Sequence, residues 1–252
     1  MANLKELVVY TDTLLGAAGF RDYCPNGLQV EGRQDVLRLV SGVTASMALI
    51  EAACEAGADA LLVHHGYFWK GEDACITGMK QRRLRRLLGA DISLLAYHLP
   101  LDAHVHLGNN TQLARVLAFE PEGTFGTEPD LQLGQYGHLS RALDAAALAA
   151  HIGERLGRVP QHIPGDAARI ESVGWCTGAA QSYIEAAAAQ GLDAFISGEI
   201  SEQTVHVARE TGIHYFAAGH HATERYGVQA LGSHLAEHFG ITHEFVDIEN
   251  PV

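Results

Sequence analysis

An internal repeat is the feature that most constrains the fold of this 252-residue chain. Residues 49–63 and 183–197 align at a shift of 134 positions and share an Ile-Glu-Ala-Ala run, a glycine and an Asp-Ala pair. In both copies the glycine, Gly57 or Gly191, separates a helix-like run from an apolar strand-like run. Such self-similarity indicates a duplicated structural unit. We therefore expect a first α/β repeat at residues 1–122 and a second at 123–252, with a C-terminal segment that can return to the first half.

Strand-like and helix-like runs alternate along both halves. Apolar runs without polar alternation, such as residues 60–63 and 194–196, are typical of strands buried on both faces. Alternation of such strands with amphipathic helices, such as residues 4–15, predicts mixed, mostly parallel sheets flanked by helices. The fold class is therefore α/β, with two similar and intertwined halves. Residues 119–137 are rich in proline and glycine and have little periodicity, which favours a boundary or crossover there.

Composition excludes several classes of protein. The 17 basic and 30 acidic residues give a net charge of −13, which argues against a nucleic-acid coat, and 47% hydrophobic residues can supply a core. The four cysteines form no C-x-x-C pair, so neither a zinc ribbon nor a disulfide-rich secreted fold is expected. Charges interrupt the first residues where a signal peptide would be apolar, and no run reaches the length of a membrane span. We expect a cytoplasmic protein without a membrane partner.

Histidine is abundant, with 15 residues, and some histidines follow predicted strands. His64 and His65 come directly after one apolar run, while the pairs His98-x-x-x-Asp102 and His220-x-x-x-Glu224 follow two others. In open α/β sheets, ligands bind at the carboxyl ends of strands, where these side chains would gather. A single histidine after a strand is usually a hydrogen-bonded structural residue. Six imidazole or carboxylate groups at three strand ends instead predict a metal site.

Two metal ions fit this set better than one. Adjacent His64 and His65 cannot point the same way from an extended chain, but a turn at the strand end can aim each ring at a different ion. Two neighbouring carboxylates, Asp102 and Glu224, would repel each other unless cations lay between them. Since no cysteine belongs to the cluster, the donor set suits Zn, Fe, Mn, Co or Ni, and donor type alone does not choose among them.

Other features have weaker functional interpretations. His234 and His238, spaced i and i+4, can clip a metal but fit surface decoration better, and His104 and His106 can orient ligands around Asp102. The basic helix predicted at Lys80–Leu88 is a solvated face or a contact for phosphate or an acidic partner. The turn at residues 108–111 is a helix cap that can also hold an anion. The chain contains no dinucleotide fingerprint, phosphate-binding loop or nucleophile elbow.

Five short motifs together resemble the NIF-three-like family, whose members are called GTP cyclohydrolase type-two homologues. The resemblance spans nearly the whole chain and is carried by Pro25-Asn26-Gly27-Leu28-Gln29-Val30, Val63-His64-His65-Gly66, His98-Leu99-Pro100-Leu101-Asp102, Ser197-Gly198-Glu199-Ile200-Ser201-Glu202 and Gly219-His220-His221-Ala222-Thr223-Glu224. It implies a duplicated α/β fold, a dinuclear metal centre between the halves and a ring-shaped homohexamer. The ligands it implies are His64, His65, His98, Asp102, His220 and Glu224.

Two functions follow as hypotheses. In the first, a metal-dependent hydrolase acts on a nucleotide-like small molecule through a metal-bridged hydroxide, attacking C8 of GTP or the phosphorus of a phosphoester. Asp102 and Glu224 would bridge the two ions, and Glu199, opposite His65 in the repeat, would be a proton shuttle, a substrate contact or a structural residue. In the second, the chain is a non-catalytic metal carrier or a scaffold. Nucleic-acid binding is a distant third.

Overall fold

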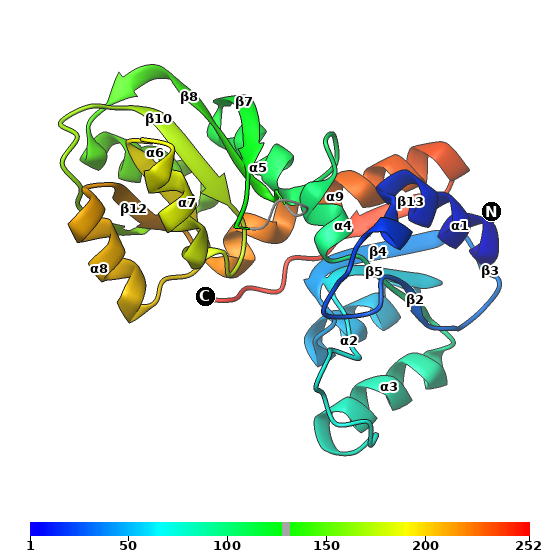
Figure 1. The fold of residues 1–252 in the computed structure, drawn as a ribbon. Coiled ribbons are helices and arrows are strands. Elements are labelled where there is room, and N and C mark those ends of the chain that lie inside the picture. Colours follow the sequence, from blue (N-terminus) through cyan, green and yellow to red (C-terminus); the bar gives the residue numbers. More distant parts are fainter. Residues whose placement is uncertain (128–131) are drawn as a thin grey trace. The chain divides into compact units, whose positions relative to one another are not determined.

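The computed structural model of the chain describes residues 1–127 and 132–252 and divides into two compact units. The units are Met1–Gly108 with Gly227–Glu249, and Asn109–Tyr226 with Asn250–Val252. The chain thus leaves the first unit after Gly108 and returns to it within the long helix α9, His220–Phe239 (Figure 1). The sequence predicts a division after residue 122.

The first unit is built on a five-stranded sheet with the order β13-β4-β5-β6-β2. Its strands β13, β4, β5 and β6 are parallel, and β2 is an antiparallel edge strand. The strand bounds are Gly27–Val30 (β2), Arg38–Thr44 (β4), Ala60–His65 (β5), Ser93–Ala96 (β6) and Thr242–Phe245 (β13). A separate short pair joins β1, Ala2–Asn3, to β3, Asp35–Val36.

Helices cover both faces of this sheet. On one face α1 and the second part of α9 enclose a core around Leu62, whereas on the other α2 and α3 enclose a core around Leu61 and Val63. Successive residues of β5 thus point to opposite faces, as in any strand, and both faces are apolar, which explains the uninterrupted apolar run in the sequence. The helices are Leu4–Leu15 (α1), Met47–Glu55 (α2), Gly78–Ala90 (α3) and the short Leu99–Ala103 (α4), with a 3-10 turn at Ala17–Gly19.

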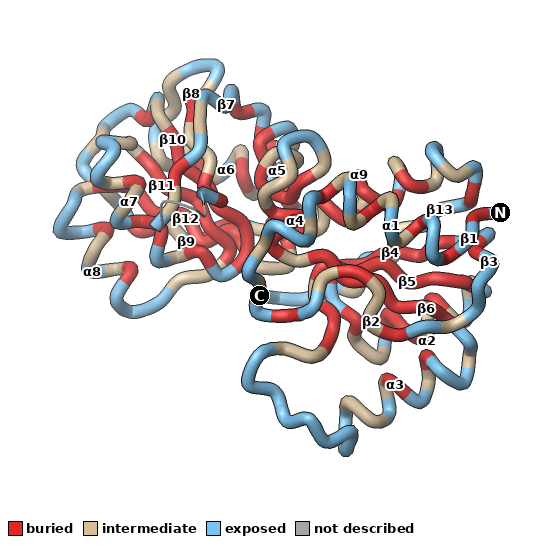
Figure 2. The backbone as a smooth tube through the Cα atoms, turned by 45° about the vertical axis from the view of Figure 1, so that its right-hand side comes forward, coloured by how far each residue is buried: buried red, intermediate tan, exposed pale blue. Residues whose placement is uncertain are grey.

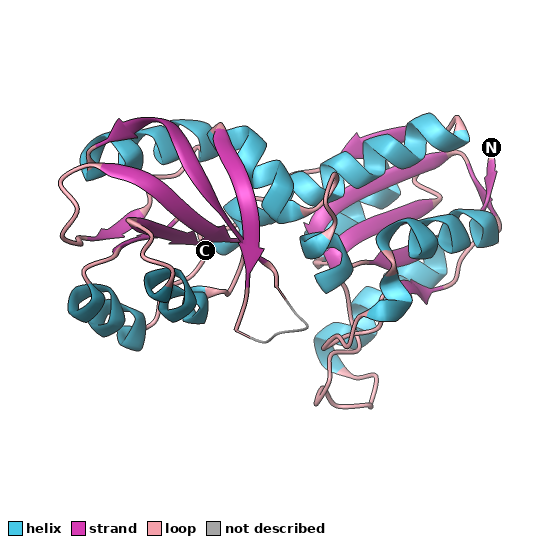
Figure 3. Cartoon of the chain, turned by 45° about the horizontal axis from the view of Figure 1, so that its top comes forward, coloured by secondary structure: helices cyan, strands magenta, loops and turns pink. Residues whose placement is uncertain are grey.

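The second unit contains a six-stranded sheet with the order β7-β8-β10-β11-β12-β9. Figure 3 shows the strands as magenta arrows. Its central strands β10, β11 and β12 are parallel, and the remaining pairs are antiparallel. The strand bounds are Phe119–Phe125 (β7), Gly134–Leu143 (β8), Gln161–Ile163 (β9), Ile170–Cys176 (β10), Ala194–Ser197 (β11) and His214–Ala217 (β12). The helices are Asn109–Leu117 (α5), Ala145–Leu156 (α6), Ile184–Ala189 (α7), which follows a 3-10 turn at Gln181–Tyr183, and Glu202–Thr211 (α8).

The core of the second unit lies mainly between its sheet and the helices α5 and α6. Trp175, Ile196 and Phe216, from three neighbouring strands, are fully buried there. In each unit the buried segments coincide with the central strands (Figure 2). The predicted α/β class with two similar halves and mixed sheets is therefore confirmed.

The proline- and glycine-rich segment 119–137 is the clearest correction to the sequence prediction. It forms most of an antiparallel pair, β7 with β8, where a boundary or crossover was expected. Pro121 is tolerated because β7 is an edge strand with a register shift between Pro121 and Gly123. Gly137 is required because an added Cβ would lie 2.0 Å from the Glu120 carbonyl oxygen. Pro129, part of the same prediction, lies outside the described residues.

The repeat predicted from the sequence corresponds to the same structural element in both units. Gly57 and Gly191 have φ values of 68° and 72°, a left-handed conformation that suits glycine after a helix. Each is followed by an aspartate and then by a central parallel strand, β5 or β11. In the part of the chain that is described, none of the helices combines the length and apolar character needed to cross a membrane.

Candidate metal centre

His64 and His65 are the last two residues of β5, at the carboxyl end of the first sheet. The His64 side chain is fully buried, and its ring centroid lies 4.6 Å from that of His65. Nδ1 of His64 is 2.9 Å from the Tyr97 carbonyl oxygen, which can only accept, so Nδ1 carries the proton. Nδ1 of His65 lies 3.2 Å from the Thr44 hydroxyl. Hydrogen bonds to Nδ1 thus orient both rings.

His98 joins these two histidines from the next strand. It follows β6 directly before α4, and its ring centroid lies 5.1 Å from that of His64 and 5.7 Å from that of His65. The three residues each offer a nitrogen within 4.8 Å of the others, which makes them a group that can hold a metal ion. Nδ1 of His98 lies 2.7 Å from Oδ1 of Asp22. Burial would raise the pKa of Asp22, but its hydrogen bonds with His98 and Asn26 outweigh this and lower the pKa to about 2.

Asp102 faces His64 from the first turn of α4. Its Oδ1 lies 3.5 Å from Nε2 of His64, and only 7% of the residue is exposed. Because Nδ1 of His64 already donates to Tyr97, a proton on Nε2 would create a fully buried imidazolium. Two ligands about 2.0–2.1 Å from a tetrahedral ion lie about 3.3 Å apart, close to the observed separation. The donor set therefore fits a cation between the two side chains.

The second unit presents its own imidazole–carboxylate pair at the start of α9. His220 and Glu224 are one turn apart, with 3.0 Å between Nε2 and Oε2, and Glu224 is 3% exposed. Nδ1 of His220 lies 2.7 Å from Oε1 of Glu199. Burial would lower the pKa of His220, but the two carboxylates outweigh this and raise it to about 9. The ring is thus held between Glu199 on Nδ1 and Glu224 on Nε2.

Each unit brings together the ligands that the sequence predicted for it. The first unit gathers His64, His65, His98 and Asp102, and the second gathers His220 and Glu224. The predicted residue Glu199 orients His220 through its ring, whereas sequence reasoning missed Asp22 and Thr44. A carboxylate within a loop, such as that of Asp22, is a weak signal without knowledge of what it faces.

The expectation that no cysteine belongs to the cluster needs correction. Cys24 lies with Asp22 and His98 in a further group of potential ligand atoms within 4.8 Å of one another. The thiol was not foreseen because Cys24 is far in sequence from His98 and reaches it through the loop before β2. Burial and the charge of Asp22 raise the pKa of Cys24 to about 12, so the thiol stays protonated near neutral pH.

Three further histidines of the first unit, His104, His234 and His238, make contacts outside this group. The Tyr10 hydroxyl lies 2.7 Å from Nε2 of His234, and the Tyr10 ring stacks on His238 with centroids 3.9 Å apart. Nδ1 of His104 accepts hydrogen bonds from the backbone of Leu107 and His106, closing a turn. These interactions give His104, His234 and His238 structural roles.

The charges of the predicted basic helix, now α3, are partly neutralised. Nε of Arg86 lies 2.9 Å from Glu51, and Nζ of Lys80 lies 3.2 Å from Glu72. Carboxylates of this chain therefore balance part of the positive charge of α3.

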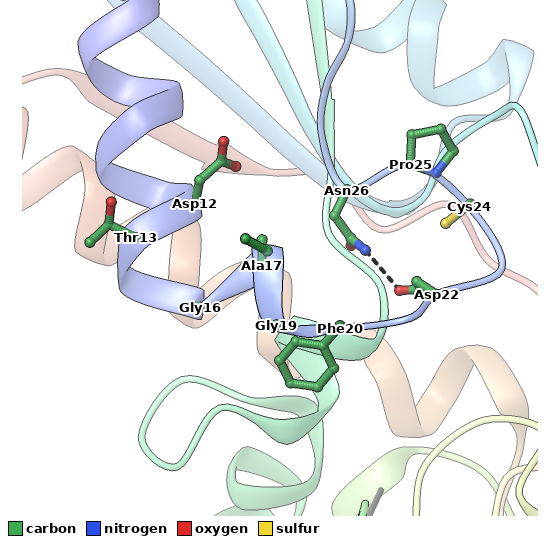
Figure 4. A pocket seen from close by; sticks show the side chains of 11 residues that line it. Asp12, Thr13, Gly16, Ala17, Gly19, Phe20, Asp22, Cys24, Pro25 and Asn26 are labelled. Carbon is green, nitrogen blue, oxygen red and sulfur yellow. Dashed lines mark hydrogen bonds between the residues drawn. The ribbon is translucent and has the colours of Figure 1, made fainter. Parts of the chain in front are cut away.

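A cavity of about 720 Å³ borders the loop that carries Asp22. It lies between the end of α1 with its following 3-10 turn and the loop at residues 22–26 (Figure 4). Asp12 also lines it and accepts a 2.7 Å hydrogen bond from the Tyr97 hydroxyl. The cavity is thus lined by two aspartates whose hydrogen-bond partners, Tyr97 and His98, are adjacent residues of the segment after β6.

The fold and the donor sets define a duplicated α/β protein with groups of histidine and carboxylate side chains that can hold metal ions. A family model described as Duf34/NIF3 (NGG1p interacting factor 3) matches residues 2–251, so the chain belongs to this family. It is 58% identical to a Pseudomonas aeruginosa protein named GTP cyclohydrolase 1 type 2 homolog, over 98% of each chain. A Vibrio cholerae protein of the same name is 57% identical over the full length of both chains.

Solved structures agree with this assignment. The structure titled protein ybgI, unknown function, matches this chain with a TM-score of 0.95 and 49% sequence identity. TTHA1606 from Thermus thermophilus matches with a TM-score of 0.90 and 33% sequence identity. Both matches cover 100% of this chain and 100% of the other chain. Reduced HcgD from Methanocaldococcus jannaschii shares the fold, with a TM-score of 0.82 at 22% identity over 99% of this chain and 98% of its own.

Proposed function

We propose that the chain is a dinuclear metal protein that acts as a metal-dependent hydrolase on a nucleotide-like small molecule. Ligands from both units would serve one centre, as the duplication and the family resemblance suggest. The proposed ligands are His64, His65, His98, Asp102, His220 and Glu224. The imidazole and carboxylate donors suit Zn, Fe, Mn, Co or Ni.

The buried pair His64–Asp102 carries this proposal. The proton of His64 is committed to Nδ1 by the Tyr97 carbonyl, while Nε2 faces a carboxylate oxygen at 3.5 Å. A neutral imidazole in this state presents a lone pair to an anion, which is unfavourable in a buried position. A divalent cation between nitrogen and oxygen turns that repulsion into attraction and matches the donor types that such ions prefer.

Each part of the site contributes to hydrolysis in a different way. When bound, a pair of divalent ions lowers the pKa of water towards neutrality and polarises the bond under attack. The histidines hold the ions through rings oriented at Nδ1, and Asp102 and Glu224 supply the balancing negative charge. Glu199 orients His220, and we assign it this positioning role in preference to proton transfer because its Oε1 is bonded to the ring.

The alternative is a non-catalytic metal carrier or a scaffold whose ions hold the fold together. Such a protein needs the same ligands but no substrate. The name shared by the bacterial relatives favours the hydrolase with GTP as the first substrate to test.

Metal-dependent turnover distinguishes the two functions. Protein loaded with Mn, Zn or Fe would be incubated with GTP and a panel of nucleotides and phosphoesters. We expect turnover that disappears in Glu224→Ala. The matched control is Glu202→Ala, because Glu202 forms an exposed pair with His206 at the same i, i+4 separation. Equal product from the Glu224 variant would refute the hydrolase, whereas metal-dependent stability without turnover would favour the scaffold.

The oligomer is a separate part of the proposal. We propose the ring-shaped homohexamer that the family resemblance implies, with the metal centres facing an inner cavity. Light scattering of the purified protein would give about six times the 27.1 kDa chain mass for a hexamer. A monomer mass would refute it.

A further inference from the structure

We propose that Asp22 is a positioning residue for the metal centre, fixing the proton of His98 on Nδ1 so that Nε2 is the nitrogen presented to a metal ion. This inference deepens the proposed function and rests on it for its consequence in metal binding. The orientation of His98 itself is a property of the metal-free protein.

The burial and the hydrogen bonds of the Asp22 carboxylate support this role. Its side chain is only 3% exposed, and both carboxylate oxygens are engaged. Oδ1 accepts from the backbone N–H of Tyr23 at 2.6 Å and lies 2.7 Å from Nδ1 of His98. Oδ2 accepts from Asn26 Nδ2 and the Leu99 backbone N–H, each at 2.9 Å. Since three partners can only donate, the carboxylate is held as a pure acceptor and His98 Nδ1 donates to it.

The same loop also fixes the backbone around His98. The His98 N–H donates to Oδ1 of Asn26 at 2.7 Å, and Asn26 is in turn bonded to Asp22. Asp22 therefore holds the ring directly and holds the backbone on either side of it through Asn26 and Leu99. A ring restrained at both its Nδ1 atom and its main chain has one orientation available.

The second unit offers an independent instance of the arrangement. His220 makes the corresponding Nδ1 contact with Glu199, also at 2.7 Å. The two carboxylates come from different places, a loop before β2 and the residue two positions after β11. When a ligating histidine donates the N–H of its other ring nitrogen to a carboxylate, this hydrogen bond fixes its tautomer and raises its basicity. The recurrence of this contact from two unrelated positions favours a role in metal binding over coincidence.

The substitution Asp22→Asn tests the proposal with little change in side-chain size. An amide has one acceptor oxygen, so if that oxygen keeps the bonds to Asn26 and Leu99, its NH₂ group faces Nδ1 of His98. The proton of the ring then moves to Nε2, which blocks this nitrogen as a ligand. The control is Asp12→Asn, an aspartate that lines the same cavity but bonds the Tyr97 hydroxyl.

Two measurements separate this inference from the proposed function. Nitrogen-15 NMR of the metal-free protein reads the His98 tautomer, assigned by the signals lost in His98→Gln. Competition with a chromophoric chelator reads the affinity for Zn²⁺. We expect a proton on Nδ1 in the wild type and in Asp12→Asn, a changed tautomer in Asp22→Asn, and about 10–100-fold weaker Zn²⁺ binding in that variant alone.

Each outcome is informative. A proton on Nε2 of His98 in the wild type overturns the inference even if Asp22→Asn does not fold. An unchanged tautomer and unchanged Zn²⁺ affinity in a folded Asp22→Asn also overturn it. Failure of the wild type to bind Zn²⁺, Mn²⁺ or Fe²⁺ refutes the proposed function, while the tautomer comparison still decides whether Asp22 positions the ring.

Discussion

The two units share a parallel three-stranded core but orient their histidines with different residues. In the first unit Asp59 accepts hydrogen bonds from the backbone at the start of β4, and in the second Asp193 accepts them at the start of β10. The carbonyls of these aspartates also accept from Ser93 and His214, the first residues of β6 and β12. The repeated Gly-x-Asp thus ties three strands together in both units.

The residues near the strand ends have diverged between the units. Position 65 holds a proposed metal ligand, whereas the equivalent position 199 holds the carboxylate that orients His220. In the first unit the orienting carboxylate for His98 comes from the loop containing Asp22. The duplicated scaffold thus keeps the same backbone hydrogen bonds in both units, whereas the carboxylate at Nδ1 comes from a different position in each.

The largest expected effect tests whether the cores of the two units contribute equally to the free energy of unfolding. Leu61 and Phe195 occupy equivalent positions of β5 and β11, and both are fully buried. We expect Phe195→Ala to lower the free energy of unfolding by about 3–5 kcal/mol and Leu61→Ala by about 2–5 kcal/mol, because each leaves a cavity. Urea denaturation of the metal-free protein measures both, with Val159→Ala, at an 83% exposed site, as the control. A loss under about 1 kcal/mol in either unit would contradict equal importance.

The next effect separates a ligand from an orienting residue. His65→Ala removes a proposed ligand, whereas Glu199→Gln at the equivalent position only weakens the orientation of His220. We expect Glu199→Gln to weaken Zn²⁺ binding about 10–100-fold and His65→Ala to weaken it more. Chelator competition gives both constants, and Glu202→Gln is the exposed control. The reverse order would mean that Glu199 is itself a ligand.

A smaller effect, dependent on pH, is expected at the aspartates of the repeat. We expect Asp193→Asn to lower the free energy of unfolding by about 1–3 kcal/mol, because the amide NH₂ is a donor and has only one acceptor oxygen beside it for the two backbone N–H groups. Burial would raise the pKa of Asp193, but hydrogen bonds from Ser172 and Glu171 lower it below the ordinary 3.8. The carboxylate thus stabilises the fold above pH 3.8, and this contribution is lost as pH falls through the lower native value.

Measuring the free energy of unfolding from pH 6 to pH 3 tests the direction of this pH dependence. The difference in unfolding free energy between the wild type and Asp193→Asn should be constant near neutrality and shrink at the acid end. A difference that grows on acidification would exclude an ionised native carboxylate.

The smallest effect concerns a contact of the first unit. Nη1 of Arg33 lies 2.9 Å from Oδ1 of Asp59, but its side chain is 42% exposed. Exposed ion pairs contribute about 0–1 kcal/mol, so Arg33→Ala should lower the unfolding free energy by less than about 1 kcal/mol. Thermal denaturation at low and high salt would check this. A loss of unfolding free energy as large as that expected for Asp193→Asn would show that Arg33 is needed for the hydrogen bonds between Asp59 and the start of β4.

Much of the fold was predictable because its signals are local. Helix α1 begins and ends where periodicity placed it, and the apolar runs at residues 60–63 and 194–196 are central strands. The pair β7–β8 was missed because its proline and glycine residues resemble a loop. The short strand β9 was missed because its pairing depends on β12, about 50 positions along the chain. Pro121 and Gly137 look like breakers in sequence but fit an edge strand and a close backbone approach.

The sequence by itself determined the α/β class, the duplication and the residue types at the strand ends, since periodicity and spacing are properties of the chain alone. Only the tertiary structure decided which nitrogen of each imidazole carries a hydrogen bond and which residue makes it. Asp22 reaches His98 across 76 positions, and Tyr97 reaches His64 across 33. Hydrogen bonds depend on distance and direction in space, and these are set when strands far apart in sequence pair side by side.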